Sequence, residues 1–226
     1  MALQTQEIEL ADWVLRVHEP SGEGPHPVIM LLHGWTGDEK VMWVFADGLP
    51  EESWVFAPRG LFSTAQGGYG WQPKLSQSWP DMDDFLPAAQ AVRGLLRDLK
   101  LRYPAASLGL DRPQWMGFSQ GAALAYSISL RYPELVSAVI GLAGFLPNGA
   151  GDYVSTQPLV GTPIFVTHGT RDKLVPVARA RQAVQLLEQA GAQVSYCEDD
   201  VGHKLSANCL RGMLRFINYL GTKGDE

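Results

Sequence analysis

The sequence has few cysteines, no excess of basic residues and no long apolar run. Its 226 residues include only two cysteines, Cys197 and Cys209. Two are too few for a disulfide framework, so we expect both to be small core residues. Lys and Arg number 18 against 24 Asp and Glu, a formal net charge of −6. This balance provides no broad electrostatic reason to bind nucleic acid.

Membrane and cofactor signals are missing as well. No segment approaches the roughly 18 consecutive apolar residues of a membrane span, and the amino-terminal residues do not resemble a secretory signal. The sequence also lacks an H-E-x-x-H motif, a close Cys/His set and a phosphate-binding G-x-x-x-x-G-K-[ST] loop. We therefore expect a cytoplasmic protein with no cofactor, no metal, no nucleic-acid partner and no integral membrane contact.

Hydrophobic residues make up 46% of the chain and charged residues 19%, which is typical of a globular protein. Short apolar runs, each followed by a turn signal, are typical of parallel strands covered on both faces. They lie at residues 28–32, 53–57, 115–118, 139–142 and 163–166, with a further strand at 194–197 and an edge strand at 10–17.

Between these runs, apolar residues recur three and four positions apart, which predicts helices. The helical patterns cover residues 85–99, 121–130, 177–187 and 209–217. Alternating strands and helices predict an α/β fold with a mainly parallel central sheet and helices on both faces. Because no linker is visible, we expect one domain over residues 1–226, with flexible ends at 1–7 and 222–226. Residues 61–80 lack a regular pattern, which is consistent with either a functional loop or a surface loop held by two buried tryptophans.

Gly117-Phe118-Ser119-Gln120-Gly121 matches the motif G-x-S-x-G at a predicted strand-to-helix turn. Such a turn exposes the serine hydroxyl above the sheet, and glycines on both sides avoid collisions with neighbouring backbone. A serine that caps the helix would give the same local pattern. The context favours a nucleophile.

A serine nucleophile needs a base, which an acid holds in place. In this fold the order along the chain is serine, acid, histidine. His168 and His203 are the histidines after Ser119, and Asp172 follows the predicted strand at 163–166. The ends of parallel strands meet at one edge of the sheet, so Ser119, Asp172 and His203 are the predicted catalytic triad. Asp152 is the alternative acid.

With these residues in order, the sequence resembles the phospholipase/carboxylesterase family of α/β-hydrolases, whose relatives include acyl-protein thioesterases. The motifs that carry the resemblance are His33-Gly34-Trp35-Thr36-Gly37, Pro58-Arg59-Gly60, the Ser119 motif, His168-Gly169-Thr170-Arg171-Asp172 and Gly202-His203. They extend from Val28 to the carboxy-terminal helix. The stretch 67–71 is more similar to bacterial members.

The resemblance implies a compact serine esterase, with an oxyanion hole made by the backbone N–H groups of Trp35 and Gln120. His33 is then structural. Fewer than 20 residues separate the strands that end near Phe145 and begin near Pro163, too few for a cap domain. We expect an open apolar pocket lined by Trp35, by Trp71 and by three further residues: Phe145, Leu146 and Leu174.

Together these patterns predict a serine carboxylesterase for small ester substrates with short or medium acyl chains, active as a monomer or homodimer. A lysophospholipase or acyl-protein thioesterase on the same fold is the alternative. A non-catalytic binding module is the remote alternative, and an intact set of candidate triad residues disfavours it.

Overall fold

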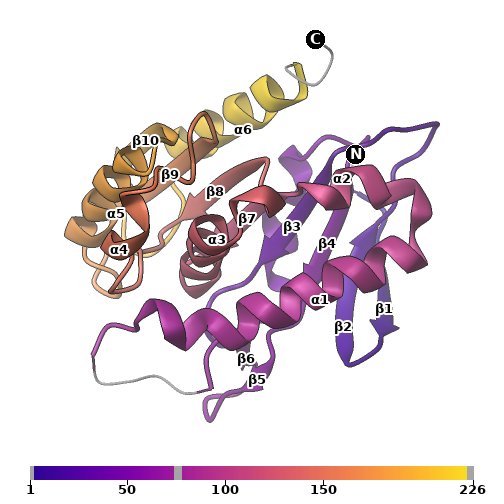
Figure 1. The fold of residues 1–226 in the computed structure, drawn as a ribbon, viewed down its shortest axis with the longest axis horizontal. Helices are drawn as coiled ribbons and strands as arrows, with labels where there is room; N and C mark the ends of the chain where they lie inside the picture. The colour runs from indigo at the N-terminus through magenta and orange to yellow at the C-terminus, as the bar shows by residue number, and fades with distance from the viewer. Residues whose placement is uncertain (1–2, 74–77, 223–226) are drawn as a thin grey trace.

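The central feature of the computed structural model, which describes residues 3–73 and 78–222, is an eight-stranded sheet in the order β1-β2-β4-β3-β7-β8-β9-β10 (Figure 1). β4, β3, β7, β8, β9 and β10 pair in parallel, and the β1–β2 hairpin joins β4 antiparallel at one edge. The strands are β1 (Gln6–Leu10), β2 (Trp13–His18), β3 (Val28–Leu32), β4 (Trp54–Pro58), β7 (Gln114–Phe118), β8 (Ala138–Leu142), β9 (Pro163–Gly169) and β10 (Gln193–Asp199).

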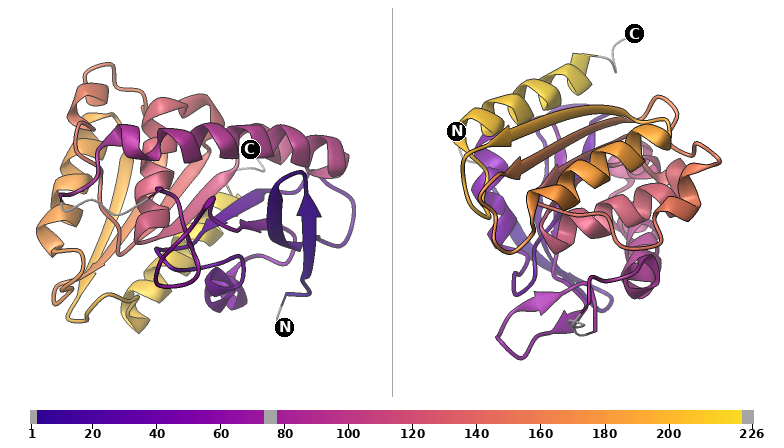
Figure 2. Two further views of the ribbon diagram at one scale, coloured as in Figure 1. Left: turned by 90° about the horizontal axis from the view of Figure 1, so that it is seen from below. Right: turned by 90° about the vertical axis from the view of Figure 1, so that its left-hand side faces the viewer.

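Helices lie on both faces of the sheet (Figure 2). α1 (Leu86–Arg102), α3 (Gln120–Arg131) and α5 (Val177–Gln189) cover one face, and α6 (Ala207–Thr222) with the 3-10 helix η1 (Val41–Gly48) covers the other. The short helices are α2 (Ser107–Asp111), α4 (Gly151–Val154) and the 3-10 turns Met82–Phe85, Pro104–Ala106 and Pro133–Leu135. The predicted α/β class is confirmed.

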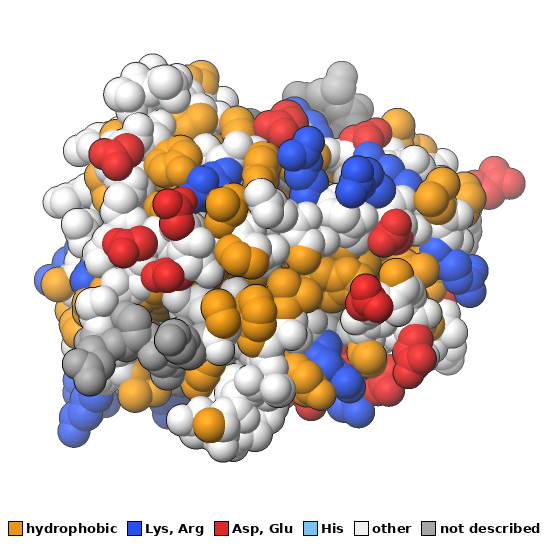
Figure 3. Space-filling model, turned by 60° about the horizontal axis from the view of Figure 1, so that its bottom comes forward, with side chains coloured by type: hydrophobic (Ala, Val, Ile, Leu, Met, Phe, Trp, Pro, Cys, Tyr) orange, Lys and Arg blue, Asp and Glu red, His pale blue; other side chains and the backbone are white. Residues whose placement is uncertain are grey.

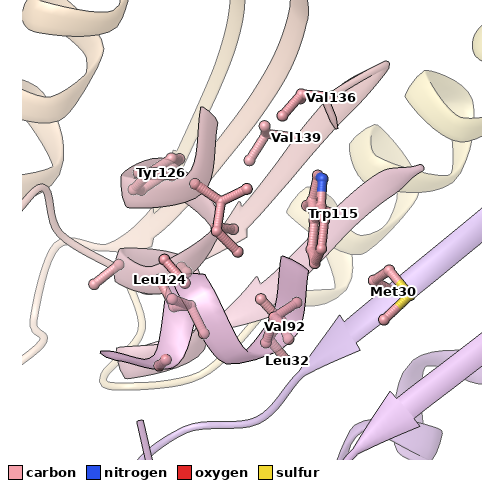
Figure 4. Close-up of a cluster of buried hydrophobic side chains, with 14 of the residues drawn as sticks. Met30, Leu32, Val92, Trp115, Leu124, Tyr126, Val136 and Val139 are labelled. Carbon is pink, nitrogen blue, oxygen red and sulfur yellow. The ribbon is translucent and has the colours of Figure 1, made fainter. Parts of the chain in front are cut away.

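The core shows why the strand residues are apolar on both sides. Every residue of β3 is buried, because helices cover both faces of the strand. Figure 4 shows Trp115 and Tyr126 in the larger of the two core clusters, among aliphatic side chains from β3, α1 and β8. The Trp115 indole donates a hydrogen bond to the carbonyl of Leu135 at 2.9 Å, so its polar atom is satisfied.

Three local predictions need correction. The expected strand at 10–17 is a hairpin that turns at Ala11, where φ is +50°. β1 begins at Gln6, inside the segment expected to be flexible, whereas residues 1–2 and 223–226 of the expected flexible ends lie outside the described residues. Cys197 and Cys209 are not separate core thiols: they form a disulfide. Spacing of 12 residues alone could not show that β10 and α6 lie side by side.

The segment between β8 and β9, residues 143–162, contains only the four-residue helix α4. This agrees with the predicted absence of a cap domain. In the described part of the chain, no helix is both long enough and apolar enough to cross a membrane. On the face shown in Figure 3, acidic and basic side chains are interspersed around a band of hydrophobic side chains.

A close approach between the backbones of β3 and α3 tests this packing. A Cβ on Gly121 would lie 2.1 Å from the carbonyl oxygen of Leu32, so Gly121→Ala forces β3 and α3 apart. We expect a loss of about 1–3 kcal/mol in the free energy of unfolding, measured in urea. Gly151→Ala, where nothing lies within 4 Å of the added Cβ, is the matched control. Equal stability of the two variants would contradict this packing.

Candidate active site

The turn between β7 and α3 holds Ser119 in a strained conformation. Its φ is +53° and its ψ −114°, outside the regions that non-glycine residues ordinarily adopt. The backbone N–H of Ser119 donates to the carbonyl of Leu142 at 2.8 Å, which ties the turn to β8. Such strain costs about 1–3 kcal/mol and persists only where surrounding contacts enforce it. Ser119 therefore sits on a sharp strand-to-helix turn, as the motif predicts.

The two motif glycines permit this turn. A Cβ on Gly117 would lie 2.3 Å from the carbonyl oxygen of Gly121. The corresponding collision of Gly121 with Leu32 is described above. Both collisions are with backbone atoms, which cannot rotate away as a side chain would.

Asp172 and His203 meet at the same edge of the sheet. His203 Nδ1 lies 2.6 Å from Asp172 Oδ2. The Asp172 side chain is fully buried, and its other oxygen, Oδ1, accepts the backbone N–H groups of Leu174 and Val175, both at 2.9 Å. A carboxylate bound in this way cannot rotate, so it fixes the orientation of the imidazole. The alternative acid, Asp152, is an exposed residue of α4.

A second histidine also contacts this carboxylate. His168 is buried at the end of β9; its Nε2 lies 2.7 Å from the carbonyl of Val175 and 3.3 Å from Asp172 Oδ2. Because a carbonyl only accepts, Nε2 carries the proton. Burial lowers the pKa of His168, which keeps the ring neutral. A neutral ring that donates to Val175 packs beside Asp172 without competing with His203 for the carboxylate.

Ser119 and His203 line one cavity of about 460 Å³. They reach it from the ends of β7 and β10, and Asp172 reaches His203 from the loop after β9. The structure thus brings together the three residues that the order of motifs predicts. Among the described residues, no group of three or more His, Cys, Asp or Glu side chains could hold a metal ion.

The loop that follows β3, residues 33–39, passes directly over Ser119. A Cβ on Gly34 would lie 3.3 Å from the Cβ of Ser119. The loop turns back through a hydrogen bond from Gly37 N to Gly34 O at 3.0 Å. Trp35 lines the cavity beside Gln120, the first residue of α3, whose N–H has no acceptor within the helix. Trp35 and Gln120, the two residues predicted to donate backbone N–H groups to an oxyanion, therefore both line the cavity that contains Ser119.

The His33 side chain stabilises this loop through two hydrogen bonds. Its Nδ1 donates to the carbonyl of Gly34 at 2.7 Å, and its Nε2 accepts the N–H of Gly60 at 2.8 Å. Only the neutral ring can donate at one nitrogen and accept at the other. Burial lowers the pKa of His33, in agreement with this assignment. The structural role expected for His33 therefore has a geometric basis.

An ion pair holds the far end of the loop. The Glu39 side chain is fully buried and accepts a hydrogen bond of 2.7 Å from Arg59 Nε. Burial acts to raise the pKa of Glu39, but the hydrogen bonds from Arg59, its own backbone and Lys40 prevail and lower it to about 2. Arg59 also lies over the ring of Tyr69. Glu39 is therefore ionised and fixed to the residue that follows β4.

The irregular stretch 61–80 packs against the loop at residues 33–39. It contains a small hairpin of β5 (Phe62–Ser63) and β6 (Tyr69–Gly70), and Tyr69 N donates to Gly37 O at 2.8 Å. A Cβ on Gly70 would lie 2.4 Å from the Trp35 ring. The β5–β6 hairpin thus packs against the ring of Trp35, which carries one of the two candidate oxyanion donors.

The residues after the hairpin connect it to the Ser119 turn. Trp71 is fully buried; its backbone N–H donates to Gln120 Oε1 and its indole N–H to the carbonyl of His33, both at 2.8 Å. Gln120 Nε2 in turn donates to Gln72 Oε1 at 2.8 Å. The motif residue Gln120 therefore connects the nucleophile turn with the irregular stretch. Residues 74–77 of that stretch lie outside the described residues.

The cavity wall differs in part from the expected pocket. Phe145, Leu174 and Trp35 line it, as predicted. Trp71 and Leu146 do not: Trp71 is held in the interior by the hydrogen bonds given above, and Leu146 is a core residue. The other lining residues were not predicted from the sequence: Gln72, Ser78, Trp79, Pro80 and Val175. The irregular stretch pointed to Trp79 without assigning it to the pocket.

The disulfide encloses the segment that carries His203. Cys197 lies in β10 and Cys209 in α6, so the bond closes the 197–209 loop around the histidine. The ring of His203 also packs on Phe118, with centroids 5.0 Å apart. The imidazole is therefore positioned from both sides, by Asp172 and by Phe118, within a cross-linked loop.

The comparisons with known proteins cover most of the chain. The model of the phospholipase/carboxylesterase family matches residues 15–221. The chain belongs to this family. It is thus an enzyme of the ester-hydrolase class.

Individual relatives are similar along most of their length. An acyl-protein thioesterase 1 of Debaryomyces hansenii is 26% identical over 214 residues, covering 84% of this chain and 89% of its own. An Arabidopsis thaliana protein described as a probable carboxylesterase is 33% identical over 208 residues, covering 91% of this chain and 77% of its own. The crystal structure of a Bacillus cereus carboxylesterase has a TM-score of 0.79 at 20% identity and covers 93% and 95% of the two chains. The last likeness shows a shared fold.

His33 makes stability depend on pH. Its folded pKa lies below the ordinary value of 6.5, so below that pH the unfolded chain binds more protons than the folded one. The free energy of unfolding therefore falls as pH falls from 7.5 towards 5. We expect this slope to be smaller in His33→Asn, although His168 retains part of it. Urea unfolding at several pH values measures the slope, and identical slopes would contradict the assignment.

The disulfide makes stability depend on redox conditions. Removing a cross-link that closes a loop of this size costs about 3 kcal/mol in the chain-entropy treatment. We expect that loss in Cys197→Ser/Cys209→Ser, measured by urea unfolding. A reductant should destabilise the wild type to the same level and leave the double variant unchanged. Insensitivity of the wild type to reductant, with its two cysteines free by thiol titration, would show that the bond is not formed.

Proposed function

We propose that this enzyme is a serine carboxylesterase that hydrolyses short- to medium-chain esters through an acyl-enzyme, with Ser119, His203 and Asp172 as its catalytic triad. The observation that carries the proposal is the 2.6 Å contact between His203 and the buried Asp172, in a cavity that Ser119 shares with His203. Asp172 accepts the hydrogen bond of His203 Nδ1, so Nε2 of the His203 ring acts as the base towards Ser119.

In the proposed reaction, Ser119 Oγ attacks the ester carbonyl while His203 Nε2 takes its proton. The oxyanion accepts hydrogen bonds from the backbone N–H groups of Trp35 and Gln120. His203 then returns the proton to the leaving oxygen, the ester C–O bond breaks, and the acyl group stays on Ser119. Water, deprotonated by the same histidine, attacks the acyl-enzyme and releases the acid. Asp172 stabilises the His203 imidazolium during both formation and hydrolysis of the acyl-enzyme.

The cavity supports the proposed substrate size. Apart from the reacting groups, its walls are largely apolar, with the aromatic rings of Trp79 and Phe145 in edge contact at a centroid distance of 5.0 Å. Among the described residues no cap covers it, and Leu174 at its rim is 70% exposed. A short or medium acyl chain fits such a site, whereas a long chain would extend into solvent.

A second candidate function is the hydrolysis of acyl thioesters. It is favoured by the similarity to proteins described as acyl-protein thioesterases. The triad chemistry is the same for a thiolate leaving group. A lysophospholipid substrate is a third alternative within the same family. Monomer and homodimer remain open predictions.

The expected cytoplasmic location also remains a prediction. Disulfides are rare in cytosolic proteins. The oxidation state of Cys197 and Cys209 in the cell therefore bears on this location.

The test is hydrolysis of p-nitrophenyl esters across acyl chain lengths. We expect an optimum at short or medium chains, and a loss of kcat of at least about a thousandfold in Ser119→Ala. Ser155→Ala, an exposed serine after α4, is the matched control and should behave as wild type. Release of thiol from acyl-thioester peptides at higher kcat/KM would favour the second candidate. Wild-type turnover by Ser119→Ala would refute the serine mechanism.

A further inference from the structure

A second apolar cavity borders residues 33–39, here called the oxyanion loop because it carries the proposed donor Trp35, and the proposed reaction does not use this cavity. Its volume is about 450 Å³, close to that of the catalytic cavity. Aliphatic and aromatic side chains dominate its wall, and Lys204 is the one charged side chain among the lining residues. It lies between the oxyanion loop, the 3-10 helix η1 and the segment after His203. The apolar side chains are those of Trp35, Val41, Met42, Val44, Phe45, Phe118 and Leu205.

This second cavity adjoins the nucleophile. Gly34 lines it, and the position of a Cβ on Gly34 is only 3.3 Å from the Cβ of Ser119. Phe118, the residue before Ser119, lines it as well. Trp35 borders both cavities, and its N–H is one of the proposed oxyanion donors. An ester carbonyl held by that donor would therefore lie at the junction of two apolar spaces.

An ester has two arms, one on each side of its carbonyl. We propose that the second cavity binds the alcohol arm of the substrate, an apolar alkyl or aryl group, while the catalytic cavity holds the acyl arm. The inference rests on the proposed function and extends it to the leaving group. It assigns Val41 and Val44 as residues that determine specificity for the alcohol.

The position of His203 determines which cavity holds the alcohol arm and which holds the acyl arm. The leaving oxygen must lie next to this imidazole, which returns a proton to it. The ring packs on Phe118, and the next two residues, Lys204 and Leu205, line the second cavity. The leaving oxygen therefore faces the side of the site on which this cavity lies. The acyl carbon, by contrast, stays bonded to Ser119 and projects along the Gln120 and Phe145 wall of the catalytic cavity.

The exposure of the second cavity suits a product that leaves first. Val44 is 74% exposed and Val41 48% exposed at its rim. When the C–O bond breaks, the leaving oxygen takes the proton from His203 and the alcohol diffuses out over these residues. Water then enters by the same route and attacks the acyl-enzyme. A closed cavity on this side would trap the alcohol and favour the reverse reaction.

The test uses two isomeric esters of equal composition, hexyl acetate and ethyl hexanoate, which differ only in which arm is long. Val44→Trp fills the second cavity at its rim. We expect it to lower kcat/KM for hexyl acetate about tenfold, mainly through KM, and to leave ethyl hexanoate within about twofold of wild type. Val41→Trp should act in the same way. Leu174→Trp, at the rim of the catalytic cavity, should show the opposite preference.

Val160→Trp is the matched control, because Val160 is 71% exposed and precedes the amino-terminal end of β9, away from the site. A loss confined to ethyl hexanoate in Val44→Trp would reverse the assignment and overturn it. Equal losses for both esters, or none, would overturn it too. Failure of wild type on both isomers and on phenyl acetate would instead refute the proposed function, and this inference with it.

Discussion

The hydrogen bond between His203 and Asp172 is the interaction on which the candidate site depends. It joins residues 31 positions apart, from the loops after β10 and β9. The parallel pairing of these strands, with Glu198 opposite His168 and Asp199 opposite Gly169, brings both loops to the same edge of the sheet. The Asp172 carboxylate is removed from water, so each of its contacts is stronger than it would be at the surface. Its hydrogen bonds with Leu174 N, Val175 N and His203 Nδ1 compensate for that burial.

The loop at residues 33–39 is held mainly by close packing at three glycines. Gly34, Gly70 and Gly121 each occupy a place where a side chain would meet neighbouring atoms at 3.3 Å or less. The oxyanion loop is thereby held between the Ser119 turn and the β5–β6 hairpin. His33 and the Glu39–Arg59 pair anchor it from within. Backbone donors fixed in this way need little rearrangement when negative charge develops on a substrate oxygen.

Most of the sheet could be predicted from the sequence, because parallel strands buried on both faces read as apolar runs. The limits of β3, β4, β7, β8, β9 and β10 each lie within three residues of the predicted ones. The meeting of Asp172 with His203 also follows from the order of motifs. The hairpin at β1–β2 could not be separated, since Ala11 and Asp12 carry no glycine or proline signal at the turn. The disulfide was missed because contact between β10 and α6 is a tertiary property, not a local pattern.

The pocket was the least predictable part, and the reason is physical. A tryptophan in an irregular stretch can face a cavity or fill the interior, and composition does not distinguish the two. Trp71 is interior because its indole N–H meets the carbonyl of His33, while Trp79, eight positions later, lines the cavity. Trp35 borders both cavities and carries one of the two proposed oxyanion donors. In the proposed arrangement of the substrate, Trp35 therefore lies between the acyl arm and the alcohol arm of the ester.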